Sequence, residues 1–182
     1  MGGGCLNIAG RECRAYSKGT HVLRNCISFD NVRKGFDQNN HPMGAWIENC
    51  LSFGNGVNFQ FWEENIEGTG WVFRNNISMN GGRKDQFKGI TLLADEHNSW
   101  NLGIKGKESD FISLSAEDAM VPRGDDGSLP GRFGRLAPGS VFIDKGTPTE
   151  TIQGDGFACD PIPYQGENPD LGAYEYDQRD RK

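Results

Sequence analysis

Three polar residues that each follow a phenylalanine are the first candidates for contact with a ligand. They occur in the triplets Gly35-Phe36-Asp37, Asn58-Phe59-Gln60 and Gln86-Phe87-Lys88, which recur at intervals of roughly two dozen residues. If each phenylalanine belongs to a strand and points into a core, the next side chain points outward. Asp37, Gln60 and Lys88 then form one outward polar column, whose carboxylate, amide and ammonium groups can hydrogen-bond a polar ligand.

Two basic residues, Arg33 and Lys34, lie beside the first of these triplets. Their side chains could pair with the carboxylates of a ligand. The alternative is that they are solvated surface cations that bind nothing. Both readings stay open on the sequence alone.

The sequence offers no recognisable metal site. His21, His41 and His97 lack the spacing of metal ligands, and Asp125-Asp126-Gly127 lacks the further acids that a loop-type calcium site needs at fixed steps. Five cysteines also lack such spacing, and an odd number cannot all pair within one chain. We therefore expect no bound metal, and mostly buried, free thiols.

A repeat defines the elements that must hold the polar column. Residues 21–31 read HVLRNCISFDN, residues 45–55 read AWIENCLSFGN and residues 71–80 read WVFRNNISMN. The shared asparagines Asn25, Asn49 and Asn75 are 24 and 26 residues apart. Self-similarity at such a period indicates a solenoid.

The period inside each unit indicates strands. Apolar columns such as Leu23/Ile47/Phe73 alternate with polar ones, mostly with a period of two. A coil of 24 residues is too short for a propeller blade, which leaves an all-β, right-handed parallel β-helix. Stacked coils place Asn25, Asn49 and Asn75 in a structural ladder at a turn, and they stack Arg24, Glu48 and Arg74 as a structural ion ladder on the outer face.

The repeat fades after about residue 101, which predicts two parts within one domain. Residues 1–103 form the coils, and residues 104–182 form an irregular tail that caps the solenoid or packs along its outside. Within the tail, Ser115 and Asp118 fit the capping box of a short helix, and the segment RGDDGSLPGRFG is typical of loops.

Composition restricts the class of protein and its partners. The net charge is −6, but basic residues exceed acidic ones by 6 to 2 in residues 1–34, while acidic residues prevail by 15 to 7 in residues 108–182. Such asymmetry is either an ordinary solvated surface or the mark of a polyanionic partner, which would then meet the N-terminal part. No apolar run approaches the length of a membrane span, and no export signal is visible. We expect neither membrane nor nucleic acid as a partner.

Several segments together resemble the C-terminal part of polysaccharide lyase family 9. They are RKGFDQNN at 33–40, the units RNCISF and RNNISMN, HNSWNL at 97–102, DGSLP at 126–130, FGRLAPGSVFIDKG at 133–146 and PDLGAYEY at 169–176. KGFDQNN is the most specific of them. The family consists of right-handed parallel β-helix pectate lyases and their relatives, so the resemblance implies the same fold.

The resemblance also implies an activity, calcium-assisted β-elimination of polygalacturonate or pectin. In the family a lysine is the base, and clustered aspartates hold Ca²⁺. The family lysine would lie just before Met1, so we expect an N-terminally truncated chain with no catalytic residue and no bound Ca²⁺. Its missing partners would be the preceding coils of the same domain. The family further implies an extracellular or periplasmic protein that binds acidic polysaccharide through Arg33, Lys34, Asp37, Gln60 and Lys88.

Two alternatives remain beside this reading. One is a non-catalytic carbohydrate-binding or structural β-helix, which would form no product. The tryptophans Trp46, Trp62, Trp71 and Trp100 could stack on sugar rings, but packing in the core or at its edge is the simpler explanation for them. The other is a hydrolase or epimerase on the same scaffold. A hydrolase needs paired carboxylates at about 5–9.5 Å, and the polar column offers one.

Overall fold

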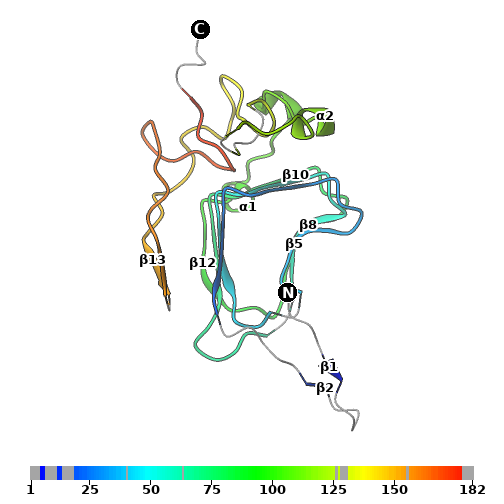
Figure 1. Cartoon of the computed structure of the whole chain (residues 1–182), viewed down its shortest axis with the longest axis vertical. Helices are drawn as coiled ribbons and strands as arrows, with labels where there is room; N and C mark the ends of the chain where they lie inside the picture. The colour runs from blue at the N-terminus through cyan, green and yellow to red at the C-terminus, as the bar shows by residue number, and fades with distance from the viewer. Residues whose placement is uncertain are drawn as a thin grey trace.

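The computed structural model describes residues 5–6, 12–13, 19–39, 41–62, 64–125, 127, 131–154 and 156–177. Successive coils of the chain stack and add one strand each to three parallel sheets. In Figure 1 the strands of each sheet lie one behind another around a common interior. The chain is a parallel β-helix, as predicted. Met1 lies outside the described residues.

The three sheets differ in the part of the coil that forms them. The first contains β3 (His21–Arg24), β6 (Ala45–Glu48), β9 (Trp71–Arg74) and β12 (Leu92–Glu96). The second contains β4 (Ile27–Phe29), β7 (Leu51–Phe53) and β10 (Ile77–Met79). The third contains β5 (Lys34–Asp37), β8 (Val57–Phe61) and β11 (Gln86–Phe87).

The remaining elements are short. A helix α1 (Ser99–Leu102) follows the last coil, and the tail carries the 3₁₀ turn η1 (Glu108–Asp110), the helix α2 (Ala116–Ala119) and the antiparallel hairpin of β13 (Ile152–Gly154) and β14 (Phe157–Cys159). β1 (Cys5–Leu6) pairs with β2 (Glu12–Cys13) in antiparallel fashion. The predicted capping residue Ser115 accepts a hydrogen bond from the backbone N–H of Glu117.

The asparagines of the predicted ladder lie at the corner between the first and second sheets, where a side-chain hydrogen bond joins Asn49 and Asn75. Asn25, Asn49 and Asn75 have φ angles of 53°, 50° and 56°, a left-handed conformation that asparagine tolerates better than most residues. The Asn75 amide donates to Oδ1 of Asn49 at 3.1 Å. The amides of Asn49 and Asn75 also donate to the carbonyls of Asp170 and Thr147, so the stack anchors the tail as well.

The residue after each of these asparagines points inward, and in the third coil it is another asparagine, Asn76. Asn76 accepts from the backbone N–H of Cys50 and donates to the carbonyl of Ile47. Cys26 and Cys50 precede it in the same column as free thiols, as predicted. A hydrogen bond from the Cys50 thiol lowers the pKa of Cys26 to about 7.

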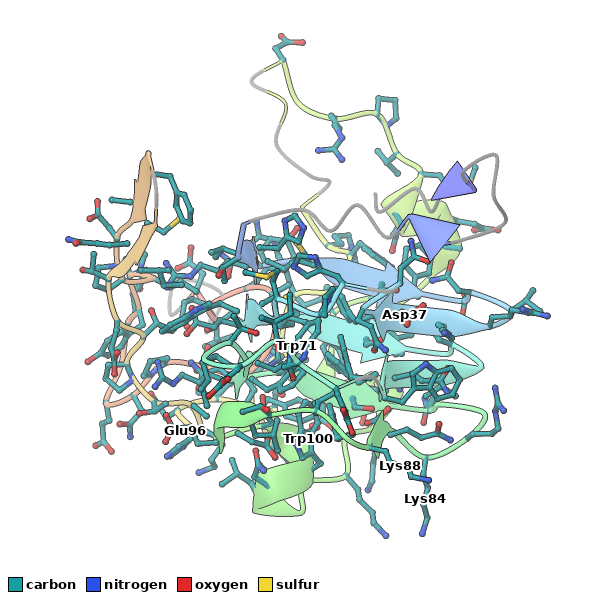
Figure 2. All side chains as sticks on the ribbon, turned by 90° about the horizontal axis from the view of Figure 1, so that it is seen from below. Asp37, Trp71, Lys84, Lys88, Glu96 and Trp100 are labelled. Atoms are coloured by element: carbon teal, nitrogen blue, oxygen red, sulfur yellow. The ribbon has the colours of Figure 1, made fainter. Side chains whose placement is uncertain are left out.

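The interior is aromatic and is closed at the end of the last coil by Trp100 of α1. Its ring lies 5.1 Å from the Phe59 ring and 5.3 Å from the Phe87 ring, and its indole N–H donates to Asp95 at 2.9 Å. Figure 2 shows Trp100 near the lower end of the stack. Helix α1, and not the tail, therefore covers this end of the interior.

The tail packs along the outside of the solenoid, against the outward apolar side of the second sheet (Figure 1). Leu51 and Ile77 are fully buried there. Their partners are tail residues of one shared cluster, which includes Phe111, Phe133, Leu136, Phe142 and Leu171. The apolar columns of this sheet thus belong to a second core between the coils and the tail.

The predicted ion ladder is confirmed on the outer side of the first sheet and extends one coil further. Glu48 contacts Arg24 at 2.7 Å and Arg74 at 3.7 Å, and Arg74 continues to Glu96 at 2.7 Å. Arg24 also donates to the carbonyl of Glu150, so the tail contacts the outer side of the first sheet as well. Burial raises the pKa of the Glu48 carboxyl, and the two arginines oppose that rise.

The tail contains one titratable group whose effect on stability can be measured. Burial raises the pKa of Glu175 from 4.5 to about 7, against the backbone hydrogen bonds from Asp170 and Gln165. Because the folded pKa lies above the unfolded one, this contribution is full below the unfolded pKa and is lost as the pH rises through about 7. We expect Glu175→Gln to flatten the fall in unfolding free energy between about pH 5 and about pH 8.

Denaturant unfolding at a series of pH values measures this slope. Glu167→Gln, at an exposed position in the same part of the tail, is the matched control and should retain the wild-type slope. Equal slopes in the wild type and the Glu175 variant would contradict the assignment.

Candidate functional site

The third sheet carries the predicted polar column on its outward side. Phe36 and Phe59 are register partners and point into the interior, where their rings stack at 5.1 Å. Asp37 and Gln60, the next residues, are also register partners. The two residues share one column, as predicted, but Gln60 is only 2% exposed, so of the two only Asp37 is open to solvent.

The prediction that Lys88 is the third member of the column is wrong. Gln60 pairs with Gln86 and Phe61 pairs with Phe87, so Gln86 completes the column. The amide of Gln60 donates to Oε1 of Gln86 at 2.7 Å. The reason is that the 26-residue offset set by Asn49 and Asn75 continues unchanged to the end of β11. Phe59 and Phe61 both point inward. The sequence alignment matched Phe87 to Phe59, whereas its true partner is Phe61, so the alignment was shifted by two residues.

Lys88 instead lies in the next column, beside Trp62. Its backbone N–H donates to the carbonyl of Phe61 at 2.9 Å, so Lys88 follows β11 as Trp62 follows β8. Lys88 is exposed, and within the ranges given above it forms no ion pair. Figure 2 shows Lys84 and Lys88 pointing away from the lowest coil, on the same side of the molecule as Asp37.

Lys34 is held by two neighbours. Its ammonium lies 2.9 Å from Oδ2 of Asp37 and 4.7 Å from the centre of the Trp62 ring. The side chains of Lys34 and Asp37 are 27% and 25% exposed, so the pair is only partly shielded from solvent. Asp37 therefore neutralises Lys34 at rest, and it would have to share Lys34 with any ligand carboxylate.

Sequence reasoning missed other groups on this side of the molecule. Arg83 forms a bridge with Val57 at the start of the strands, next to Arg33, whose carbonyl accepts the Val57 N–H at 2.8 Å. Lys84 follows Arg83, and both are exposed. The signal that could have found them is the constant 26-residue offset, because it aligns 83 with 57. We call the set Arg33, Lys34, Arg83, Lys84 and Lys88 the basic face.

Two acidic groups near the basic face, Asp37 and Asp85, are already engaged. Asp37 pairs with Lys34, and Oδ1 of Asp85 accepts the N–H of Phe59 at 2.9 Å. Burial raises the pKa of Asp85. A protein with a net charge of −6 thus exposes a cluster of cations along its third sheet. Such a surface attracts anionic ligands.

The described residues do not fit a metal ion, because no three of their His, Cys, Asp and Glu side chains are grouped to hold one. Among the helices that the structure describes, none is both long and apolar enough to cross a membrane.

Comparison with known proteins identifies relatives of the fold and of the sequence. No family model matches the chain. Pectate lyase L of Dickeya chrysanthemi is 35% identical over 158 residues, which cover 86% of this chain and 34% of that protein. Pectate lyase L of Paenibacillus polymyxa is 35% identical over 142 residues, covering 74% and 30%. The crystal structure of pectate lyase Pel9A matches with a TM-score of 0.69 and 36% identity, over 87% of this chain and 36% of that one.

The resemblance to polysaccharide lyase family 9 is confirmed. The chain is pectate lyase-like in sequence and in its parallel β-helix fold. It spans about a third of the length of the curated pectate lyases that it matches. The part of this chain that aligns with those pectate lyases includes the coils that carry the basic face.

Proposed function

We propose that this chain is a polysaccharide-binding part of a pectate lyase-like β-helix and that its ligand is an acidic polymer such as polygalacturonate or pectin. The observation that carries the proposal is the basic face on a protein of net charge −6. The names of its relatives indicate which polyanion to test first. In the same proposal the protein meets this polymer outside the cytoplasm.

Each predicted contact residue has a role in this proposal. Arg33, Lys34 and Lys88 supply cations along the third sheet, so that one polymer chain can contact several coils at once. Asp37 supplies hydrogen-bond acceptors for sugar hydroxyls, whereas Gln60 is buried and supports the neighbouring coil instead. The Gln60–Gln86 hydrogen bond fixes the orientation of the amides between two coils.

We also propose that the described residues bind without turnover. β-Elimination needs a base for the proton α to the uronate carboxylate and cations that neutralise this carboxylate. The described carboxylates do not form a calcium site, so no step is assigned to Ca²⁺ here. Lys34 is engaged as an ammonium by Asp37 and is therefore unsuited to be the base.

The binding proposal predicts saturable, salt-sensitive affinity for polygalacturonate. We expect the combined variant Arg33→Gln, Lys34→Gln, Lys88→Gln to bind about tenfold more weakly, because exposed ion pairs contribute up to about 1 kcal/mol each. Lys145→Gln, an exposed lysine of the tail, should bind like the wild type. Titration calorimetry at two salt concentrations measures both effects, since screening weakens exposed charge pairs.

Two results would contradict the proposal. Equal affinity for polygalacturonate and for fully methyl-esterified pectin would show that the cations do not recognise the carboxylates. Sustained formation of unsaturated product with Ca²⁺, followed by ultraviolet absorbance, would contradict binding without turnover.

A further inference from the structure

We infer that Trp62 and Lys88 form a subsite for a single uronate unit, in which the indole stacks on the sugar ring and the ammonium pairs with its carboxylate. The inference rests on the proposed function, because it specifies how one unit of the polymer is held. It concerns a residue pair that lies beside the polar column and does not belong to it.

Exposure separates Trp62 from the other tryptophans. Trp71 is 2% exposed within the interior, Trp100 closes the end of the coils, and Trp46 lies under the guanidinium of Arg74 on the first sheet. Packing accounts for those three. Trp62 is 49% exposed, which is far more than a residue of this size needs for packing.

The neighbouring residues hold Trp62 outward in a fixed position. Phe61 points inward, with its ring 4.6 Å from Trp71 and 5.1 Å from Phe73, so the next side chain must leave the interior. The backbone N–H of Trp62 donates to Oε1 of the buried Gln38 at 3.1 Å. Lys34 covers part of the ring from the coil above. The indole is thus positioned before any ligand binds, which reduces the entropy lost on binding.

Lys88 supplies a second cation beside this platform. It lies one coil below Trp62 in the same column, at the spacing of neighbouring parallel strands. Lys34 already has Asp37 as its counter-ion, whereas Lys88 has no ion-pair partner in the described ranges. Lys88 is therefore the cation available to pair with an anion bound at Trp62.

A uronic acid matches both groups. Its ring presents C–H bonds to the face of the indole, and its carboxylate extends from the ring edge toward a neighbouring cation. A neutral sugar could use only the aromatic surface. The pair therefore favours charged units over methyl-esterified ones.

Affinity measurements with an oligogalacturonate and its methyl ester test the subsite. We expect Trp62→Ala to weaken binding of the oligogalacturonate about tenfold, and Trp62→Phe to retain most of the affinity. Lys88→Gln should weaken binding of the acid about threefold and leave binding of the ester unchanged. Lys145→Gln is the matched control for charge. Unfolding midpoints of all variants should stay close to that of the wild type because both side chains are exposed.

The outcomes separate the subsite from the proposed function. If the wild type binds and Trp62→Ala binds equally well, the subsite is wrong while polysaccharide binding stands. If Lys88→Gln weakens the acid and the ester alike, the ammonium does not read the carboxylate and the subsite is again wrong. If the wild type does not bind the oligomer at all, both proposals fail.

Discussion

The Asn76→Ala protein should unfold with a free energy about 3–5 kcal/mol below that of the wild type. The Asn76 side chain is fully buried and accepts from the N–H of Cys50 at 3.0 Å. It donates to the carbonyl of Ile47 and to Oδ1 of Asn98, both at 2.8 Å. Alanine leaves buried polar groups of two neighbouring coils without partners, at about 1–3 kcal/mol each.

This loss is a large part of the 5–15 kcal/mol that typically separates folded from unfolded domains. Urea unfolding followed by circular dichroism measures it. Asn168→Ala is the matched control, because Asn168 is exposed and its side chain makes no hydrogen bond found among the described residues. The control should change stability by less than about 0.5 kcal/mol. Similar effects at both positions would mean that the inward asparagine does not join the coils.

Replacing Glu48 by alanine should also lower the free energy of unfolding by about 3–5 kcal/mol. The Glu48 side chain is fully buried between Arg24 and Arg74, whose side chains are 12% and 11% exposed. Removing the carboxylate leaves two largely buried guanidinium groups without their central counter-ion. The effect is therefore the penalty of uncompensated charge and not the net value of the ion pair.

The same ladder provides the control for this prediction. Glu96 pairs with Arg74 at 2.7 Å, but its side chain is 48% exposed. Glu96→Ala should therefore reduce stability by no more than about 1 kcal/mol. Thermal and denaturant unfolding of the two variants compare a buried and an exposed member of one ladder. If both substitutions had equally small effects, solvent would have to reach Glu48, contrary to the structure.

The coil architecture was predictable because identical chemistry recurs at one corner of every coil. Asn25, Asn49 and Asn75 gave the offsets of 24 and 26 residues at which β3, β6 and β9 pair, whereas β5 and β8 pair at an offset of 23. The ion ladder followed from the same alignment. Asp37 and Gln60 were paired correctly because Phe36 and Phe59, which directly precede them, are register partners.

Features that depend on contacts between distant segments were not predictable. Leu51 and Ile77 repeat like core residues, yet they face outward and are buried by the tail, with Ile27 partly buried beside them. An apolar period of two shows which side of a strand is buried, but it does not show which segment of the chain covers that side. Trp100 closes the interior from a four-residue helix outside the repeat. Lys88 was misplaced because Phe59 and Phe61 point to the same side, and the exposure of Trp62 has no signature in sequence.

Lysine acetylation with and without polygalacturonate, followed by mass spectrometry, tests most directly whether the basic face binds the polymer. The account predicts that the polymer slows the labelling of Lys34, Lys84 and Lys88 but not of Lys145, which lies in the tail. Slower labelling of Lys145 to the same extent, or unchanged labelling of Lys84 and Lys88 at saturating polymer, would contradict it.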